Sequence, residues 1–139
     1  MVEITATQAQ AAIAAGVAKA KELGSPSSLT ILDSGRNLIA MLRMDGALLA
    51  SIEISHGKAY TARSLNMKTG DVTQYVQPGG PFYGMETSHR QPMVIFAGGL
   101  PVEDNGQVVG AVGVAGGTLD NDVAVAESML AALKSLKPN

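Results

Sequence analysis

The chain has 139 residues, 46% of them hydrophobic, with 10 basic and 12 acidic side chains and no cysteine. This composition predicts a globular protein of one domain, residues 1–139, and excludes disulfides, thiolate zinc sites and iron–sulfur clusters. A net charge of −2 without a basic cluster argues against a nucleic-acid partner, and no apolar run approaches the ~20 residues that a membrane span needs. The N-terminus lacks the basic start and apolar core of a signal peptide, so we expect cytoplasmic residence and no membrane partner.

The first predicted element is a helix from Thr5 to about Leu23. Thr5 and Gln8 have the spacing of a capping box, in which each side chain bonds the backbone N–H of the other residue. Gly24 suits the position after a helix end, and Pro26 prevents the helix from continuing. The apolar stripe of this helix is thin in large side chains, so the helix needs a surface to lie on.

A hairpin and a second helix follow. Strands are predicted over Ser28–Asp33 and Asn37–Arg43, joined by a turn-forming cluster at residues 33–36. A helix then runs from about Leu48 to Leu65, with two distinct faces at 100° per residue. One face has mainly small or apolar side chains: Ser51, Ile54, Ser55, Lys58, Ala59, Ala62 and Leu65. The opposite face, expected to point away from the sheet, has Glu53, His56, Tyr60 and Arg63.

Residues 66–92 show no sustained period and contain several glycines and prolines. An irregular segment of this length usually forms a lid or a pocket wall. A strand is predicted over Met93–Ala97, and the pair Asn105-Gly106 then marks a tight hairpin turn.

The run Gln107–Ala115 alternates with period two and places Val109, Ala111, Gly113 and Ala115 on one face. Apart from Val109, the side chains on that face are no larger than a methyl group. This predicts a central strand with a helix packed closely against its small side chains. A last helix is predicted from the capping candidates at residues 118–122 to about Leu136. The element order predicts an α/β (α+β) fold, with an antiparallel sheet between helices on both faces.

Several stretches resemble the GlcG/HbpS-like haem-binding domain family, which includes the C-terminal domain of PduO-type proteins. The matching stretches are 33–40 (DSGRNLIA), 43–47 (RMDGA), 58–62 (KAYTA), 98–102 (GGLPV), 109–117 (VGAVGVAGG) and 122–126 (DVAVA). The resemblance implies a profilin-like three-layer α/β/α sandwich with a sheet of about five strands, assembly into homo-oligomers, and haem as a cofactor of some members. Ala115 departs from the family, which often has serine there.

Lys58 is the only charged side chain on the small, apolar face of its helix. A buried ammonium group needs an anionic partner or loses its proton, because desolvation disfavours its charge. A structural interpretation pairs it with Asp33 or Asp45, or lets its amine reach solvent at an edge of the packed layer. A functional one makes it a cation for a ligand carboxylate, or a base of depressed pKa.

The chain has two histidines, His56 and His89. His56 is interpreted as a surface or subunit-contact residue. His89 lies in the irregular segment and is the candidate haem-iron ligand or general base. Tyr83, Met67 and Met85 are alternative candidates for the haem-iron ligand, because tyrosine and methionine can also ligate haem iron. Arg43 and Arg90 are candidate carboxylate partners, and Gly98 and Gly99 are counted with the ligand-binding residues.

The sequence is compatible with two functions and with a third, purely structural interpretation. In the first, the protein binds a small ligand, haem or a related tetrapyrrole, in a pocket between the Lys58 helix and residues 66–92. In the second, it is a cofactor-independent enzyme of small organic acid catabolism, in which Lys58 or His89 transfers a proton. A structural oligomer without a ligand is the third interpretation.

Overall fold

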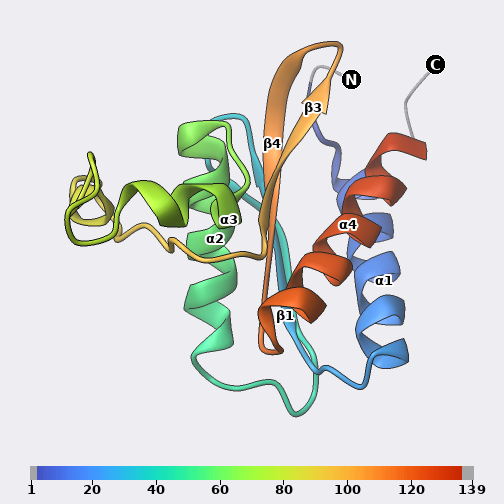
Figure 1. Ribbon diagram of the computed structural model, residues 1–139. Helices are drawn as coiled ribbons and strands as arrows, with labels where there is room; N and C mark the ends of the chain where they lie inside the picture. The colour runs from blue at the N-terminus through green and yellow to red at the C-terminus, as the bar shows by residue number, and fades with distance from the viewer. Residues whose placement is uncertain (1–2, 136–139) are drawn as a thin grey trace.

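The computed structural model describes residues 3–135 as a four-stranded antiparallel sheet between two layers of helices. The strand order is β2-β1-β4-β3, with β1 Ser28–Asp33, β2 Leu38–Arg43, β3 Gly99–Asp104 and β4 Gln107–Ala115. Helix α2, Ser51–Leu65, covers one face, and α1, Ala6–Glu22, and α4, Leu119–Ser135, lie side by side on the other (Figure 1). In this part of the chain no helix is both long and apolar enough to cross a bilayer.

The predicted helix and hairpin signals are confirmed. Thr5 accepts a hydrogen bond from the Gln8 backbone N–H, and the Gln8 side chain accepts one from the Thr5 N–H. The hairpin between β3 and β4 turns at Asn105 and Gly106, whose φ angles of 51° and 79° are both positive, as a type I′ turn requires. Helix α4 ends within the described residues at Ser135, and Leu136 lies outside them.

The prediction of a strand over Met93–Ala97 is wrong, and the sheet has four strands where about five were predicted. The backbone N–H groups of this segment do not hydrogen-bond to a neighbouring strand. The Met93 N–H donates to the Glu86 carbonyl, and the Val94 N–H donates to the Thr61 hydroxyl. The segment therefore packs against α2 instead of joining a sheet edge. The preceding residues hold only short helices, α3 Thr69–Val72, η1 Thr73–Tyr75 and η2 Met85–Thr87, which agrees with the predicted irregular segment.

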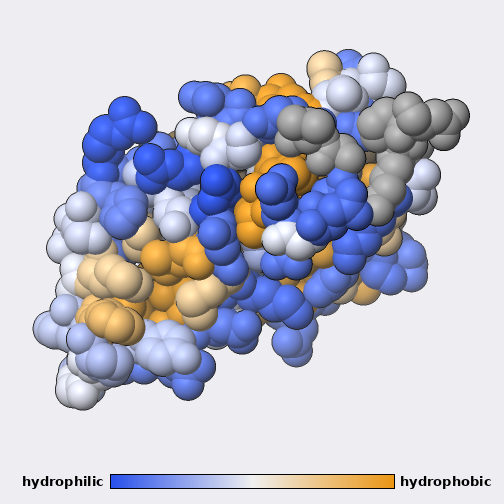
Figure 2. Space-filling model, turned by 90° about the horizontal axis from the view of Figure 1, so that it is seen from above, coloured by the Kyte–Doolittle hydropathy of each residue, from blue (hydrophilic) through white to orange (hydrophobic). Residues whose placement is uncertain are grey.

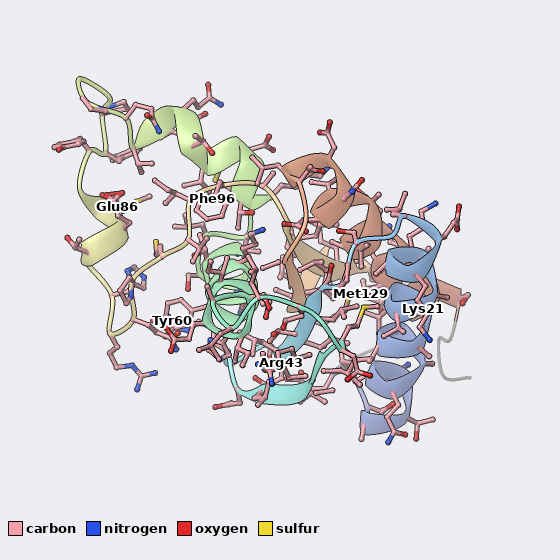
Figure 3. The ribbon with its side chains drawn as sticks, turned by 90° about the horizontal axis from the view of Figure 1, so that it is seen from below. Lys21, Arg43, Tyr60, Glu86, Phe96 and Met129 are labelled. Atoms are coloured by element: carbon pink, nitrogen blue, oxygen red, sulfur yellow. The ribbon has the colours of Figure 1, made fainter. Side chains whose placement is uncertain are left out.

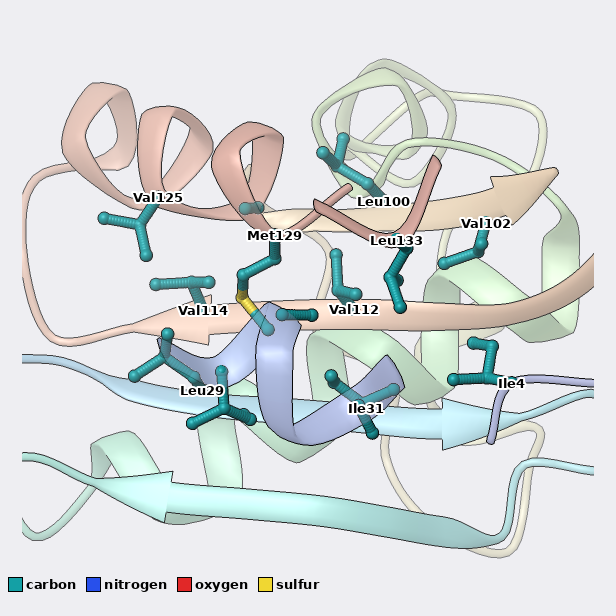
Figure 4. Close-up of a cluster of buried hydrophobic side chains, with 14 of the residues drawn as sticks. Ile4, Leu29, Ile31, Leu100, Val102, Val112, Val114, Val125, Met129 and Leu133 are labelled. Carbon is teal, nitrogen blue, oxygen red and sulfur yellow. The ribbon is translucent and has the colours of Figure 1, made fainter. Parts of the chain in front are cut away.

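The main core fills the space between the sheet and the pair α1 and α4. Its large side chains come from alternate positions of the strands and from α4, among them Leu29, Ile31, Val112, Val114 and Met129 (Figure 4). Helix α1 approaches both α4 and the sheet closely at Gly16, where an added Cβ would lie 2.8 Å from the Met129 Cγ of α4 and 2.3 Å from a Leu29 methyl group of β1. This face is therefore a closely packed apolar layer.

The opposite face of the sheet carries small and hydroxyl side chains beneath α2. Ser28 and Thr30 of β1 pair their hydroxyl groups with Ser51 and Ser55 of α2, at 2.7 and 2.8 Å. An added Cβ at Gly113 of β4 would lie 2.1 Å from the Ser55 carbonyl oxygen. The prediction that a helix presses onto the small face of a central strand is thus confirmed.

Candidate functional site

Lys58 of α2 is buried, with 1% of its surface exposed, as its sequence setting predicted. Its Nζ donates hydrogen bonds to the Asp122 Oδ2 at 3.0 Å and to the Val114 carbonyl oxygen at 2.8 Å, and it lies 5.2 Å from the centre of the Phe96 ring. The predicted partners, Asp33 and Asp45, are wrong. The partner is an aspartate in the first turn of α4, on the other side of the sheet.

Glycines make room for this side chain. A Cβ added at Gly98 would lie 2.6 Å from the Lys58 Nζ, and one at Gly99 would lie 2.4 Å from the Lys58 carbonyl oxygen. The Asp122 carboxylate is held in turn by the Gly117 N–H, which donates to its Oδ1 at 3.0 Å. The predicted grouping of Lys58 with Gly98 and Gly99 is therefore present, because the glycines let the amine cross from α2 to α4.

Burial lowers the pKa of the Lys58 amine below its ordinary value, because desolvation disfavours the charged form. The Asp122 carboxylate acts in the opposite direction through its charge and its hydrogen bond, and desolvation remains the larger effect. The result is a lysine that releases its proton more readily than an exposed one.

A small cavity of about 160 Å³, which we call the Lys58 pocket, opens beside this pair. Lys58 and Asp122 line it together with Phe96 and apolar side chains that include Leu48 and Leu119. Glycine backbone at residues 116–117 forms part of the wall. The pocket can hold a small molecule of a few atoms against a buried ion pair.

A larger cavity of about 470 Å³, the α2 groove, runs along the outward side of α2. Its walls are mainly apolar, and they come from β2, α2 and the segment that returns toward β3. The lining residues are Met41, Ile52, Glu53, Ile54, His56, Gly57, Gln91, Pro92 and Val94. His56, interpreted from the sequence as a surface residue, is the imidazole of this groove.

His89 lies against Tyr60 rather than in the α2 groove. The two rings meet edge to face with their centres 6.1 Å apart, and the Ser88 hydroxyl hydrogen-bonds the His89 Nδ1 at 3.0 Å. Tyr60, on the helix face predicted to point away from the sheet, is nonetheless buried, with only 1% of it exposed. Figure 3 shows Tyr60 between α2 and the irregular segment that bears Glu86.

The structure does not bring the remaining predicted residues together. Arg43 is exposed at the end of β2, beside a different cavity lined by Lys21 and Met44, far from Glu86 (Figure 3). Tyr83 and Arg90 are exposed on the irregular segment, and Met67 and Met85 are half-buried. Within residues 3–135, no three His, Asp or Glu side chains cluster in a way that could hold a bare metal ion.

Sequence reasoning missed Asp122 and His56. Asp122 is separated from Lys58 by 64 positions. Its place as an acidic residue opening a helix, and in the matching stretch 122–126, does not identify Lys58 as its partner. His56 shares a helix face with Glu53 and Tyr60. The helical periodicity of the sequence does not show that residues 91–94 pack beside His56 and complete a groove with it.

Taken together, the antiparallel sheet, the helix pressed on its small face and the glycine-lined lysine define a small domain of the α+β class. The particular family follows from comparison: residues 4–131 match the family described as haem degrading protein HbpS-like, and the chain belongs to it. A 15.0 kDa Citrobacter freundii protein from the dhaT–dhaS intergenic region is 46% identical over 127 residues, covering 91% of this chain and 89% of that protein.

Solved structures agree with this assignment. The Klebsiella pneumoniae protein ORFY superposes with a TM-score of 0.94 at 40% identity, covering 99% of this chain and 95% of that one. The complex of PduOC with haem superposes with a TM-score of 0.90 at 30% identity, covering 94% and 95% of the two chains.

Proposed function

We propose that this protein binds haem or a related tetrapyrrole in the α2 groove, between the Lys58 helix and the end of the irregular segment. Membership of the HbpS-like family and the likeness to the haem complex of PduOC support the ligand. The observation that carries the location is an imidazole, His56, on the wall of an otherwise mainly apolar groove.

The groove suits a flat, apolar macrocycle. Its volume of about 470 Å³ lies within the usual range of ligand pockets, and Ile52, Ile54, Pro92 and Val94 offer aliphatic contact. When bound, haem would supply iron-centred redox chemistry, and the chain would supply the axial ligand, the orientation and the exclusion of water.

Haem also needs a ligand for its iron and cationic partners for its propionates, and polar residues in and beside the groove are the candidates for both. His56 is our first candidate for the iron ligand, and His89 is the second. Arg90 is exposed next to Gln91 of the groove and is the candidate partner of a propionate. Lys58 is already engaged by Asp122, so its amine is less available for this role.

The test is a haemin titration followed by the Soret band, with matched His56→Ala and His89→Ala variants. We expect a shifted band in the wild type that changes position in His56→Ala and is retained in His89→Ala. The reverse pattern would move the iron ligand to His89. A wild-type spectrum identical to that of haemin in buffer would discard the proposal.

A second function has one specific observation in its favour, the lowered pKa of Lys58 beside a small pocket. In this alternative, Lys58 transfers a proton to or from a small oxo acid. Deuterium exchange into the methyl group of pyruvate, followed by NMR in D₂O, tests it. Exchange above the buffer rate that is lost in Lys58→Met supports the alternative, and a wild-type rate equal to that of buffer discards it.

Assembly into a homo-oligomer is part of the proposal. Exposed leucines support it, notably Leu48 and Leu49 before α2 and Leu119 at the start of α4. Apolar patches also lie between hydrophilic ones on the surface seen from above (Figure 2). Native mass spectrometry of the purified protein reports the subunit number and any ligand that co-purifies.

A further inference from the structure

A polar cleft of about 390 Å³ lies next to Tyr60 and apart from the residues of the α2 groove. Its lining combines two arginines, a histidine, two serines and a glycine: Ser34, Gly35, Arg36, Arg63, Ser64 and His89. We call it the arginine cleft. It joins the β1–β2 turn, the end of α2 and the irregular segment, three parts of the chain that are distant in sequence.

Arg36 is held in a defined orientation. Its backbone has a φ of 66°, in the left-handed region that a non-glycine residue seldom adopts. Its guanidinium lies over the Tyr60 ring at 4.6 Å from the ring centre, and its Nη1 donates to the Ser64 hydroxyl at 3.2 Å. The aromatic face and the hydroxyl thus position the cation without neutralising it.

Arg63 is also positioned by neutral acceptors. Its Nε donates to the Ser34 carbonyl oxygen at 2.7 Å, and its Nη1 donates to the Asn66 Oδ1 at 2.7 Å. An arginine has five N–H donors in a planar fork, so Arg63 keeps further donors for a ligand. The bond to Ser34 ties α2 to the turn that bears Arg36.

The nearby carboxylates bond neutral groups of the β1–β2 turn and not the arginines. Asp33 accepts hydrogen bonds from the backbone N–H groups of Gly35 and Asn37, and Glu3 accepts one from the Ser34 hydroxyl. Across residues 3–135, neither arginine forms an ion pair with a carboxylate. The cleft therefore collects two fixed guanidinium groups and an imidazole, with no carboxylate among its lining residues.

We propose that the arginine cleft is a second binding site, which takes an oxyanion: a carboxylate or phosphate group of a small metabolite. Fixed guanidinium groups match the oxygens of such groups and can donate two parallel hydrogen bonds to them. The His89 imidazole lines the same cleft and offers a further donor, whereas the Ser34 and Ser64 hydroxyls already donate to Glu3 and to the Tyr60 carbonyl oxygen. This inference does not rest on the haem proposal, because no residue of the cleft lines the α2 groove.

The test uses the full chain and two probes, inorganic phosphate and malonate, titrated at constant ionic strength set with sodium chloride. Binding is measured by calorimetry and by NMR shifts of the Gly35 amide and the Arg63 Nε–H. We expect saturable shifts at these groups with at least one probe. Arg36→Gln should weaken that binding about tenfold, because one charge-assisted contact is lost. Lys134→Gln, which removes an equal charge from the exposed end of α4, should leave it unchanged.

The titrations decide whether the arginine cleft binds an oxyanion. Saturable binding that Arg36→Gln weakens and Lys134→Gln does not would establish the site. Absence of a localised shift with both probes, or equal loss in the two variants, would overturn it. Haemin titration of Arg36→Gln identifies the source of the anion: an unchanged haemin affinity indicates a separate metabolite, and a weakened one indicates that the cleft receives haem propionates.

Discussion

The two faces of the sheet carry different kinds of side chain. The face toward α1 and α4 is closed by large aliphatic side chains that interdigitate, whereas the face toward α2 carries alanine, glycine and paired hydroxyl groups. The first arrangement stabilises the fold through apolar burial. The second brings α2 close to the backbone of β4 and makes room for one buried lysine. Helix α2 lines part of the Lys58 pocket, of the α2 groove and of the arginine cleft.

The largest expected effect comes from the ion pair that connects the two faces. Lys58→Met leaves the Asp122 carboxylate buried without its cation, so the free energy of unfolding should fall by about 3–5 kcal/mol. Urea denaturation measures it. The double variant Lys58→Met/Asp122→Asn should recover part of the loss. A cost below about 1 kcal/mol would show that the pair does not hold the layers together.

A smaller effect is expected from adding one methyl group to the polar face. Gly113→Ala places its Cβ against the α2 backbone, which cannot move as a side chain can, and should cost about 1–3 kcal/mol. The matched control is Gly35→Ala in the exposed β1–β2 turn, expected within about 0.5 kcal/mol of the wild type. Equal thermal stability of the two variants would contradict the close approach of α2.

The paired hydroxyl groups offer a finer probe. Thr30→Val keeps the shape of the side chain and removes its hydrogen bond to Ser55, so it should cost about 1 kcal/mol. Thr7→Val, at an exposed position of α1, controls for the change of residue type. If both variants unfold at the same urea concentration, the hydroxyl pair contributes nothing to the attachment of α2.

The smallest effect is a dependence on pH. Because the native pKa of Lys58 is the lowered one, the native state releases this proton first as pH rises. Between the native pKa and the ordinary lysine value the unfolded chain binds more protons, so the free energy of unfolding rises with pH in this interval. The difference between wild type and Lys58→Met should therefore grow over this alkaline range. A difference that stays flat would contradict the lowered pKa.

Local signals in the sequence predicted much of the fold. The capping box at Thr5, the Asn105-Gly106 turn and the small face of β4 each depend on residues a few positions apart, and all three are confirmed. The strand expected at Met93–Ala97 is wrong because its apolar content suits an extended segment against α2 as well as it suits a sheet edge. Whether such a segment finds a ladder partner depends on the tertiary fold.

The candidate sites could be predicted only in part. Burial of Lys58 followed from its helix face, but its partner Asp122 could not be identified because the contact crosses the sheet. The burial of Tyr60 could not be predicted, because periodicity cannot show that Arg36 and His89 would cover it. The α2 groove and the arginine cleft both depend on where the irregular segment returns, and no local pattern encodes that path.

The most direct test of the haem proposal is to locate haemin on the protein by its paramagnetism. Amide signals of ¹⁵N-labelled protein are compared between haemin, which broadens nearby signals, and zinc protoporphyrin, which does not. We predict broadening centred on residues 52–57 and 91–94, with α1 and α4 unaffected. Broadening centred on another surface, or none at a saturating haemin concentration, would contradict the account.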